Sequence, residues 1–188
     1  MMIPGLKVVV PSNALDVVGL MAASIRDDDP VIFLEAKSLY SSKMDVPDGE
    51  ILDTLGSAKV LRQGTSATLV ALGAMVPKAL AAAEELAQSC IDCTVVDVRS
   101  LVPLDTATIL REVSATGRLF TIEENPRLCG WGGELSSIVS EEAFYDLDGP
   151  IVRITTPHIP LPAADALEDM AIPSIERIVT TVTKSMNS

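Results

Sequence analysis

Residues 67–98 read ATLVALGAMVPKALAAAEELAQSCIDCTVVDV and predict a strand, a helix and a second strand. Residues 67–72 are an apolar run of strand length, and Pro77 suits the first turn of a helix. Leu80, Ala83, Leu86 and Ala87 form the apolar stripe of that helix, which ends near Ser89, and residues 94–98 are the second apolar run. Two apolar strands joined by a helix favour a parallel sheet.

The flanking sequence extends this pattern in both directions. Residues 58–62 predict a further strand, and the short turn around Gly64 favours an antiparallel hairpin with residues 67–72. Downstream we expect a helix capped by Asp105 and ended by Gly117, a strand at 118–122, a helix at 131–145, a strand at 151–155 and a last helix opened by Pro173. Residues 58–188 therefore predict a three-layer α/β domain, whose five-stranded, mostly parallel sheet has one antiparallel strand.

The first 40 residues predict a separate βαβ unit. Residues 7–10 are a β-branched run, Ser12 and Asn13 offer a helix cap, and residues 31–34 are a second short strand. Two parallel strands need neighbours in a wider sheet, so this unit looks like part of a larger domain. Because residues 41–55 lose all periodicity, we place a domain boundary there, with residues 1–50 as the end of one domain plus a linker and residues 58–188 as the second domain.

The composition excludes several classes of function. The chain has 14 Lys and Arg against 26 Asp and Glu, a net charge of −12, and no basic run, which argues against a nucleic-acid partner. No apolar run approaches the roughly 20 residues that span a bilayer, so no membrane partner is expected. Three cysteines do not make a disulfide framework, and we expect a cytoplasmic protein.

Three motifs that could carry chemistry have simpler explanations. Cys90 and Cys93 lie between a helix end and a strand, where no helix dipole lowers a thiol pKa, and too few other ligands remain for zinc. Gly130-Trp131-Gly132-Gly133 precedes a helix but departs from the dinucleotide-binding pattern, and two glutamates upstream would repel phosphate. His158 is the single histidine and has no nucleophile beside it in sequence. We assign no catalytic and no cofactor-binding residue.

Asp27, Asp28 and Asp29 are more informative because they follow the end of a predicted helix, where the helix dipole is negative. Arg26 can offset one of these charges. A cation held by the last helical carbonyls and carboxylate oxygens would offset more, since hard cations take oxygen ligands. A plain surface loop is the alternative.

Several segments in one order resemble a known family. They are residues 3–12 (IPGLKVVVPS), 25–31 (IRDDDPV), 73–75 (GAM), 97–105 (DVRSLVPLD) and 172–178 (IPSIERI). This series resembles the β subunit of the thiamine-diphosphate-dependent 2-oxo acid dehydrogenases, the decarboxylating component of the pyruvate, branched-chain and acetoin complexes. The resemblance covers essentially the whole chain. It implies the end of a pyrimidine-binding domain followed by a complete C-terminal domain of the transketolase type.

The resemblance also implies a metal site and a set of cofactors. In relatives, the helix end and loop that match Ser24, Ile25, Asp27 and Asp29 hold a structural potassium ion, although Asp29 replaces the asparagine common there. The family's glutamate that activates the aminopyrimidine ring and its active-site histidine lie upstream of the Ile3-Pro4-Gly5-Leu6 motif, and His158 does not match that histidine. We therefore expect thiamine diphosphate and magnesium to be bound by the full enzyme and not by this span alone.

Two functional hypotheses follow. In the first, the chain is the C-terminal part of an enzyme that decarboxylates a 2-oxo acid and acylates lipoamide, and this span serves assembly. Its partners would be a second copy, the α subunit and the basic subunit-binding domain of the acyltransferase. In the second, it is a stand-alone dimerisation or binding module, or the C-terminal domain of a transketolase, a deoxyxylulose phosphate synthase or a 2-oxo acid:ferredoxin oxidoreductase. Neither hypothesis gives the substrate.

Overall fold

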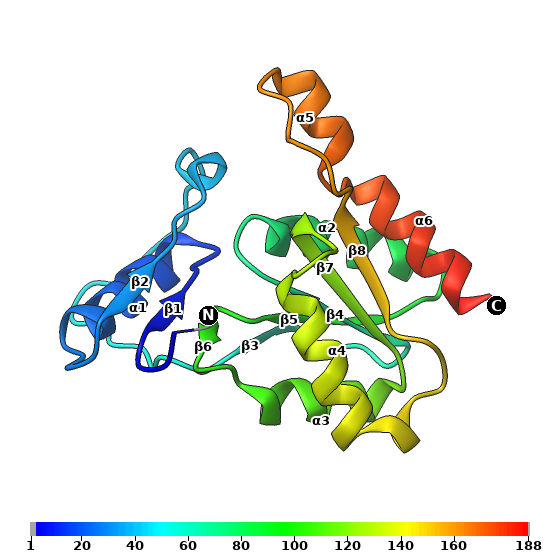
Figure 1. The fold of residues 1–188 in the computed structure, drawn as a ribbon, viewed down its shortest axis with the longest axis horizontal. Coiled ribbons are helices and arrows are strands. Elements are labelled where there is room, and N and C mark those ends of the chain that lie inside the picture. Colours follow the sequence, from blue (N-terminus) through cyan, green and yellow to red (C-terminus); the bar gives the residue numbers. More distant parts are fainter. Residues whose placement is uncertain (1–2, 188) are drawn as a thin grey trace.

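The structure, a computed structural model, describes residues 3–187, which form two units side by side (Figure 1). The first unit contains β1 (Lys7–Val9), α1 (Ala14–Ile25), β2 (Val31–Phe33) and a short 3-10 helix, η1 (Lys37–Leu39). β1 and β2 pair in parallel, as the sequence predicts. α1 begins where expected, because the Asn13 side chain accepts a hydrogen bond of 3.0 Å from the Asp16 N–H.

The second unit is a three-layer α/β domain, which confirms the predicted fold class. Its sheet has the order β3-β5-β4-β7-β8, with β3 antiparallel to β5 and the other neighbours parallel. The strands are β3 (Lys59–Arg62), β4 (Ala67–Ala71), β5 (Cys93–Asp97), β7 (Leu119–Pro126) and β8 (Val152–Thr156). The helices are α2 (Met75–Gln88), α3 (Thr106–Thr116), α4 (Trp131–Glu142), α5 (Asp165–Ala171) and α6 (Ile175–Met186), with a 3-10 turn, η2 (Phe144–Asp146), after α4.

Two apolar clusters hold the helices on opposite faces of this sheet. On one face, Val76 and Leu86 of α2 and Ile178 of α6 pack with strand residues such as Leu69. On the other face, Val113 of α3 and Leu135 of α4 pack with other strand residues such as Val96. Alternate strand residues serve the two clusters, since successive side chains point to opposite faces.

The predicted hairpin is wrong. β3 does not pair with β4, because β5 lies between them. Residues 63–66 cross the start of β5, where the N–H groups of Thr65 and Ser66 donate to the Asp92 carbonyl at 2.9 and 2.7 Å. Two strands that are neighbours in sequence, β3 and β4, are thus separated in the sheet by β5, which follows both of them in the chain. The antiparallel direction of β3 was predicted correctly.

Four short elements, β6, α5, η1 and η2, were not predicted. β6 (Ser100–Val102) leaves the second unit and pairs antiparallel with β1, so the first unit's sheet has the order β2-β1-β6. α5 follows β8 and stands away from the body at the top of Figure 1. The predicted helix 131–145 instead ends at Glu142 and continues as η2.

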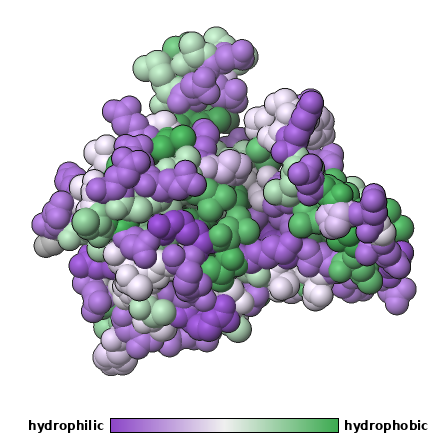
Figure 2. Space-filling view, turned by 180° about the vertical axis from the view of Figure 1, so that it is seen from behind, coloured by the Kyte–Doolittle hydropathy of each residue, from purple (hydrophilic) through white to green (hydrophobic). Residues whose placement is uncertain are grey.

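Apolar side chains line the hollows between the two units. One, of about 450 Å³, lies between the start of α1 and Leu61, Val76 and Leu80. Another, of about 440 Å³, lies between Val8 and Ile32 of the small sheet and the turn before α4. From behind, hydrophobic residues gather between the two parts of the molecule (Figure 2). None of the helices in the described part of the chain is long and apolar enough to cross a membrane.

Candidate functional site

The most extensive buried polar arrangement lies where the two units meet. Strand β6 brings the end of β5 against the first unit, and the Val10 N–H donates to the Arg99 carbonyl at 2.8 Å. Around this contact lie six polar side chains from both units, here called the junction cluster: Ser12, Asp16, Asp53, Lys59, Asp97 and Arg99.

Arg99 is the centre of the junction cluster. Its side chain is 1% exposed and its backbone is left-handed, with φ of 59°, which is rare for a residue with a Cβ. The guanidinium lies 3.1 Å from the Asp16 carboxylate, pairs with Asp53 and donates to the Ser57 carbonyl at 3.0 Å. Among the described residues its Nε atom has no hydrogen-bond partner. A charge this deeply buried is stable only when it is paired. Because Asp16 belongs to α1 of the first unit and Arg99 follows β5 of the second, this ion pair holds the two units together.

Lys59 supplies the second positive charge. Its ammonium lies 2.6 Å from the Asp16 carboxylate and 3.3 Å from that of Asp53. Burial alone would raise the pKa of Asp53. Hydrogen bonds from Arg99 and the Thr54 N–H, together with the charges of Arg99 and Lys59, outweigh the effect of burial, so the pKa of Asp53 is lowered. Asp53 and Asp16 therefore balance the charges of Lys59 and Arg99.

Asp97 is the third carboxyl group of the cluster and has no cation of its own. The Ser12 hydroxyl donates to it at 2.5 Å and the Arg99 N–H at 3.1 Å. Burial, together with the charge of Asp16, raises the pKa of Asp97 to about 7. The two hydrogen bonds and the charge of Arg99 oppose the rise only in part. The junction thus contains a carboxyl group that gains or loses a proton near neutral pH.

A second buried carboxylate lies at the carboxyl end of β7. Glu123 accepts two hydrogen bonds from Arg153 of β8, at 2.7 and 2.8 Å, and further ones from Thr121, Asn125 and the Gly132 N–H. Burial tends to raise the pKa of Glu123, but these bonds outweigh it and lower the pKa. The glycine-rich turn before α4 is therefore fitted around an internal anion, since a Cβ at Gly132 would collide with the Glu123 carboxylate.

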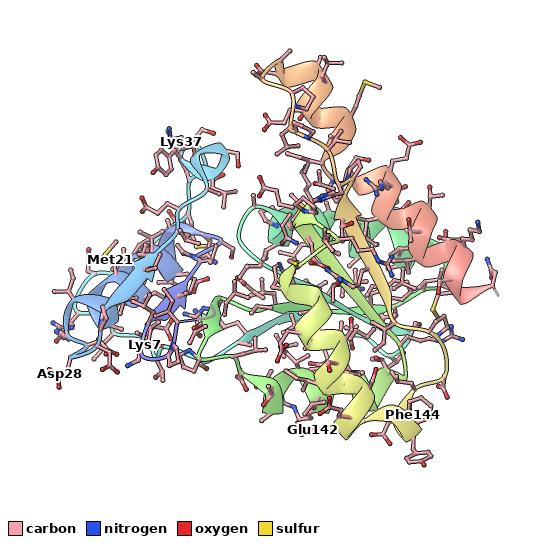
Figure 3. The ribbon with its side chains drawn as sticks, viewed as in Figure 1. Lys7, Met21, Asp28, Lys37, Glu142 and Phe144 are labelled. Carbon is pink, nitrogen blue, oxygen red and sulfur yellow. The ribbon has the colours of Figure 1, made fainter. Side chains whose placement is uncertain are left out.

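The predicted metal-site residues lie together at the end of α1 with a lysine among them. Lys7 Nζ is 2.7 Å from Asp27 and 3.1 Å from Asp29. Ser24 donates to the Leu20 carbonyl at 2.7 Å, and Ile25 is exposed. Figure 3 shows Lys7 and Asp28 both toward the lower end of the first unit. The hydrogen bond and charge of Lys7 lower the pKa of Asp27, so this lysine supplies part of the positive charge that the aspartates require.

The other sequence candidates lie apart from the junction. Cys90 is exposed with φ of 60°, whereas Cys93 is buried in β5, where burial raises its thiol pKa to about 11. A thiol with that pKa is a poor nucleophile. His158 is exposed in the loop after β8. Within residues 3–187 no group of three or more His, Cys, Asp or Glu side chains could hold a metal ion.

Sequence reasoning missed the junction cluster and the Glu123 site. Two local signals point to the junction cluster: a charged pair, Asp97 and Arg99, at the end of a buried strand, and an aspartate, Asp16, in the first turn of an apolar helix. The pairing of these residues depends on β6, whose contacts are distant in sequence.

Thiamine diphosphate, the cofactor that the family resemblance implies, places a chemical requirement on the acids within residues 3–187. Activating its aminopyrimidine requires a carboxyl group that faces the ring. Besides Asp16, Asp97 and Glu123, the remaining buried acid is Glu112, which accepts hydrogen bonds from Gln63 at 2.6 Å and Arg111 at 2.9 Å. Because each of these four groups already has partners inside the protein, this span does not by itself fit the cofactor.

Two family models match the chain. The one described as the transketolase C-terminal domain matches residues 56–178, and the one described as the transketolase pyrimidine binding domain matches residues 1–43. The two matches correspond to the two units of the structure.

Curated relatives extend the likeness. Pyruvate dehydrogenase E1 component subunit beta of Rickettsia felis is 46% identical over 97% of this chain and 56% of its own length. Acetoin:2,6-dichlorophenolindophenol oxidoreductase subunit beta of Bacillus subtilis is 44% identical over 95% of this chain and 52% of its own. A solved structure described as a split gene transketolase, inactive beta4 tetramer, shares 28% identity and a TM-score of 0.79, covering 99% of this chain and 59% of that one. The chain spans about half the length of the curated relatives it matches.

Proposed function

Since the chain belongs to the transketolase C-terminal-domain family, we propose that it is the C-terminal portion of the β subunit of a thiamine-dependent 2-oxo acid dehydrogenase. One observation carries this proposal: the identity of 46% to a pyruvate dehydrogenase β subunit extends over 97% of the chain. The reaction is oxidative decarboxylation of a 2-oxo acid with transfer of the acyl group to lipoamide. Pyruvate is the substrate named for one relative, and a branched-chain oxo acid is a second candidate. Acetoin, named for another relative, has no carboxyl group and would be cleaved between its two oxygen-bearing carbons, with release of an aldehyde in place of carbon dioxide.

The role of this span is to assemble and orient subunits. The junction cluster fixes the end of the pyrimidine-binding unit on the C-terminal domain through Arg99, Asp16 and Lys59. Paired strands β1 and β6 add backbone hydrogen bonds between the same two units. A cofactor site made with other parts of the enzyme needs such a fixed frame, because catalytic groups must be held within fractions of an ångström.

Thiamine diphosphate and magnesium belong to the complete enzyme in this proposal. The cofactor, when bound, stabilises the carbanion left by decarboxylation. Potassium at Ser24, Ile25, Asp27 and Asp29 is a further proposal, supported by the two carboxylates at the end of α1 and opposed by Lys7, which competes for them.

The proposed partners are a second copy of the chain, the α subunit and the basic subunit-binding domain of the acyltransferase, in the cytoplasm. The net charge of −12 supports the last of these, because opposite charge speeds association and its effect weakens with salt. The test is capture of the cognate α subunit by the tagged chain. Co-elution supports the proposal.

A second candidate is a stand-alone binding module that forms only homo-oligomers. The likeness to the split gene transketolase described as an inactive beta4 tetramer favours it. A chain that self-associates and does not capture the α subunit at any salt concentration would favour this candidate over the first.

A further inference from the structure

The charges of the junction cluster do not balance. Its carboxyl groups are those of Asp16, Asp53 and Asp97, and its cations are Lys59 and Arg99. If all of these groups were ionised, the cluster would hold one negative charge without a counter-ion. Asp16 and Asp97 are fully buried, where an unpaired ion is strongly unfavourable. The cluster therefore requires one further positive charge, and a proton supplies it without additional space.

Asp97 is the group that the geometry marks for this proton. Both cations lie on other carboxylates, since Lys59 Nζ is 2.6 Å and the Arg99 guanidinium 3.1 Å from Asp16. Asp97 forms no ion pair with a described lysine or arginine, although Lys59 is its neighbour on β3. Its carboxyl group lies 2.5 Å from the Ser12 hydroxyl, and because a hydroxyl can donate or accept, this contact suits the charged and the neutral acid alike. The raised pKa of Asp97 agrees with this assignment.

The charged and titratable groups that face Asp97 are the other members of the cluster. They come from the elements packed against it, apart from β4, whose residue beside Asp97 is an alanine. Asp16 lies in α1, Asp53 between β2 and β3, Lys59 in β3 and Arg99 after β5. The charge of Asp16 favours the proton, and the charge of Arg99 opposes it. The protonation of Asp97 thus depends on both units at once.

This proton also lies on a narrow connection between the two units. Ser12 belongs to the first unit and Asp97 to the second, so their contact exists only while the units are docked. The rest of the connection includes the pairing of β1 with the short strand β6 (Figure 1) and the bond from the Val10 N–H to the Arg99 carbonyl. Hollows of about 450 and 440 Å³ remain between the units. A connection this incompletely packed can open while the large sheet stays folded.

We propose that the junction cluster is a proton-dependent latch: protonated Asp97 holds the first unit on the second, and loss of the proton loosens this contact without unfolding the large sheet. In the open junction Asp97 meets water and titrates near 3.9, whereas its pKa in the closed junction is about 7. The contribution of the proton to docking is therefore complete below about pH 4 and is lost as the pH rises to about 7. The inference goes beyond the proposed function and can fail without it.

Hydrogen exchange followed by NMR at single amides tests the latch on the full chain. The reporter is the Val10 amide, which donates across the junction, and the reference is the Val70 amide in β4, at the centre of the large sheet. After correction for intrinsic exchange, Val10 should be at least about tenfold less protected than Val70 at about pH 5.5 and at about pH 8. Between these pH values the protection of Val10 should fall by up to about 30-fold.

Two variants identify the titrating group. Asp97→Asn is neutral at every pH and can keep both hydrogen bonds, so the pH dependence of Val10 protection should disappear. Ser12→Ala removes a hydrogen bond that favours the charged acid, so the pH above which protection is constant should move upward. A merely structural Ser12 would weaken the contact without moving that pH. The control, Asp169→Asn, changes an exposed carboxyl group in α5 and should keep the wild-type profile.

Three results would overturn the proposal. Equal protection at Val10 and Val70 would mean that the units separate only when the whole protein unfolds. Protection of Val10 that does not change with pH, or an Asp97→Asn variant with the wild-type pH dependence, would show that this proton does not control docking. If Asp97→Asn fails to fold, the Ser12→Ala profile decides: an upward shift supports the latch, and an unshifted profile overturns it.

Discussion

Asp97 shows how one residue can make the joining of two units depend on pH. It is fully buried, it has two hydrogen-bond donors, and its pKa is raised to about 7 by burial and by Asp16. The folded protein therefore binds this proton more tightly than the unfolded chain, in which an aspartate titrates near 3.9. The stabilisation from the bound proton is complete below about pH 4 and is lost as the pH rises to about 7.

We predict that Asp97→Asn removes this pH dependence. The amide is neutral at every pH and can keep the hydrogen bonds to Ser12 and the Arg99 N–H. Relative to the wild type, the variant should gain free energy of unfolding as the pH rises from 5 to 8, by at most about 3 kcal/mol. Urea unfolding at both pH values measures the difference. Parallel pH profiles for the two proteins would show that Asp97 does not titrate in this range.

Lys7 and Asp27 give a second prediction at this scale. If a potassium ion also binds the aspartates at the end of α1, the melting temperature of the wild type should be higher in potassium chloride than in choline chloride or sodium chloride. Asp27→Asn should abolish that difference, and Lys7→Met should enlarge it, because the competing ammonium is 2.7 Å from Asp27. Equal melting temperatures in all three salts, for wild type and Lys7→Met alike, would argue against the ion.

At the scale of elements, β3 and β6 show what local sequence could not predict. The strands other than β6, the helix cap at Asn13 and the left-handed Gly117 that ends α3 follow from local patterns, and the structure contains all of them. The place of β3 beside β5, and the pairing of β6 with β1, depend on contacts between residues far apart in the chain. The same holds for the junction cluster, whose members come from residues 12 to 99.

Gly64 tests the crossing that separates β3 from β4. A Cβ at this position would lie 2.6 Å from the Asp92 carbonyl oxygen and against the Cys93 backbone, neither of which can move freely. We expect Gly64→Ala to lower the free energy of unfolding by about 2 kcal/mol, a typical cost of forced overpacking. The neighbouring Thr65→Ala changes an exposed residue and should cost much less. A Gly64→Ala variant as stable as the wild type would mean that the link passes farther from β5.

For the whole molecule, the proposed role is that of a frame that completes an enzyme and does not form its cofactor site alone. The buried acids Asp16, Asp97, Glu112 and Glu123 all have partners inside the protein. We therefore predict that titration calorimetry of this chain with thiamine diphosphate and magnesium shows no binding at micromolar concentrations. Saturable binding in that range would require a cofactor site within these residues.

The proposed function is tested by an assay of the chain joined to the upstream residues that its relatives possess and combined with the α subunit. Pyruvate, a branched-chain 2-oxo acid, acetoin and a ketose phosphate are supplied in turn, and reduction of a dye acceptor or transfer of a two-carbon unit is followed. We predict thiamine-dependent dye reduction with one of the first three substrates and no transfer of a two-carbon unit from the ketose phosphate. Two-carbon transfer from the ketose phosphate, with no turnover of the other three, would contradict it and place the chain with the transketolases themselves.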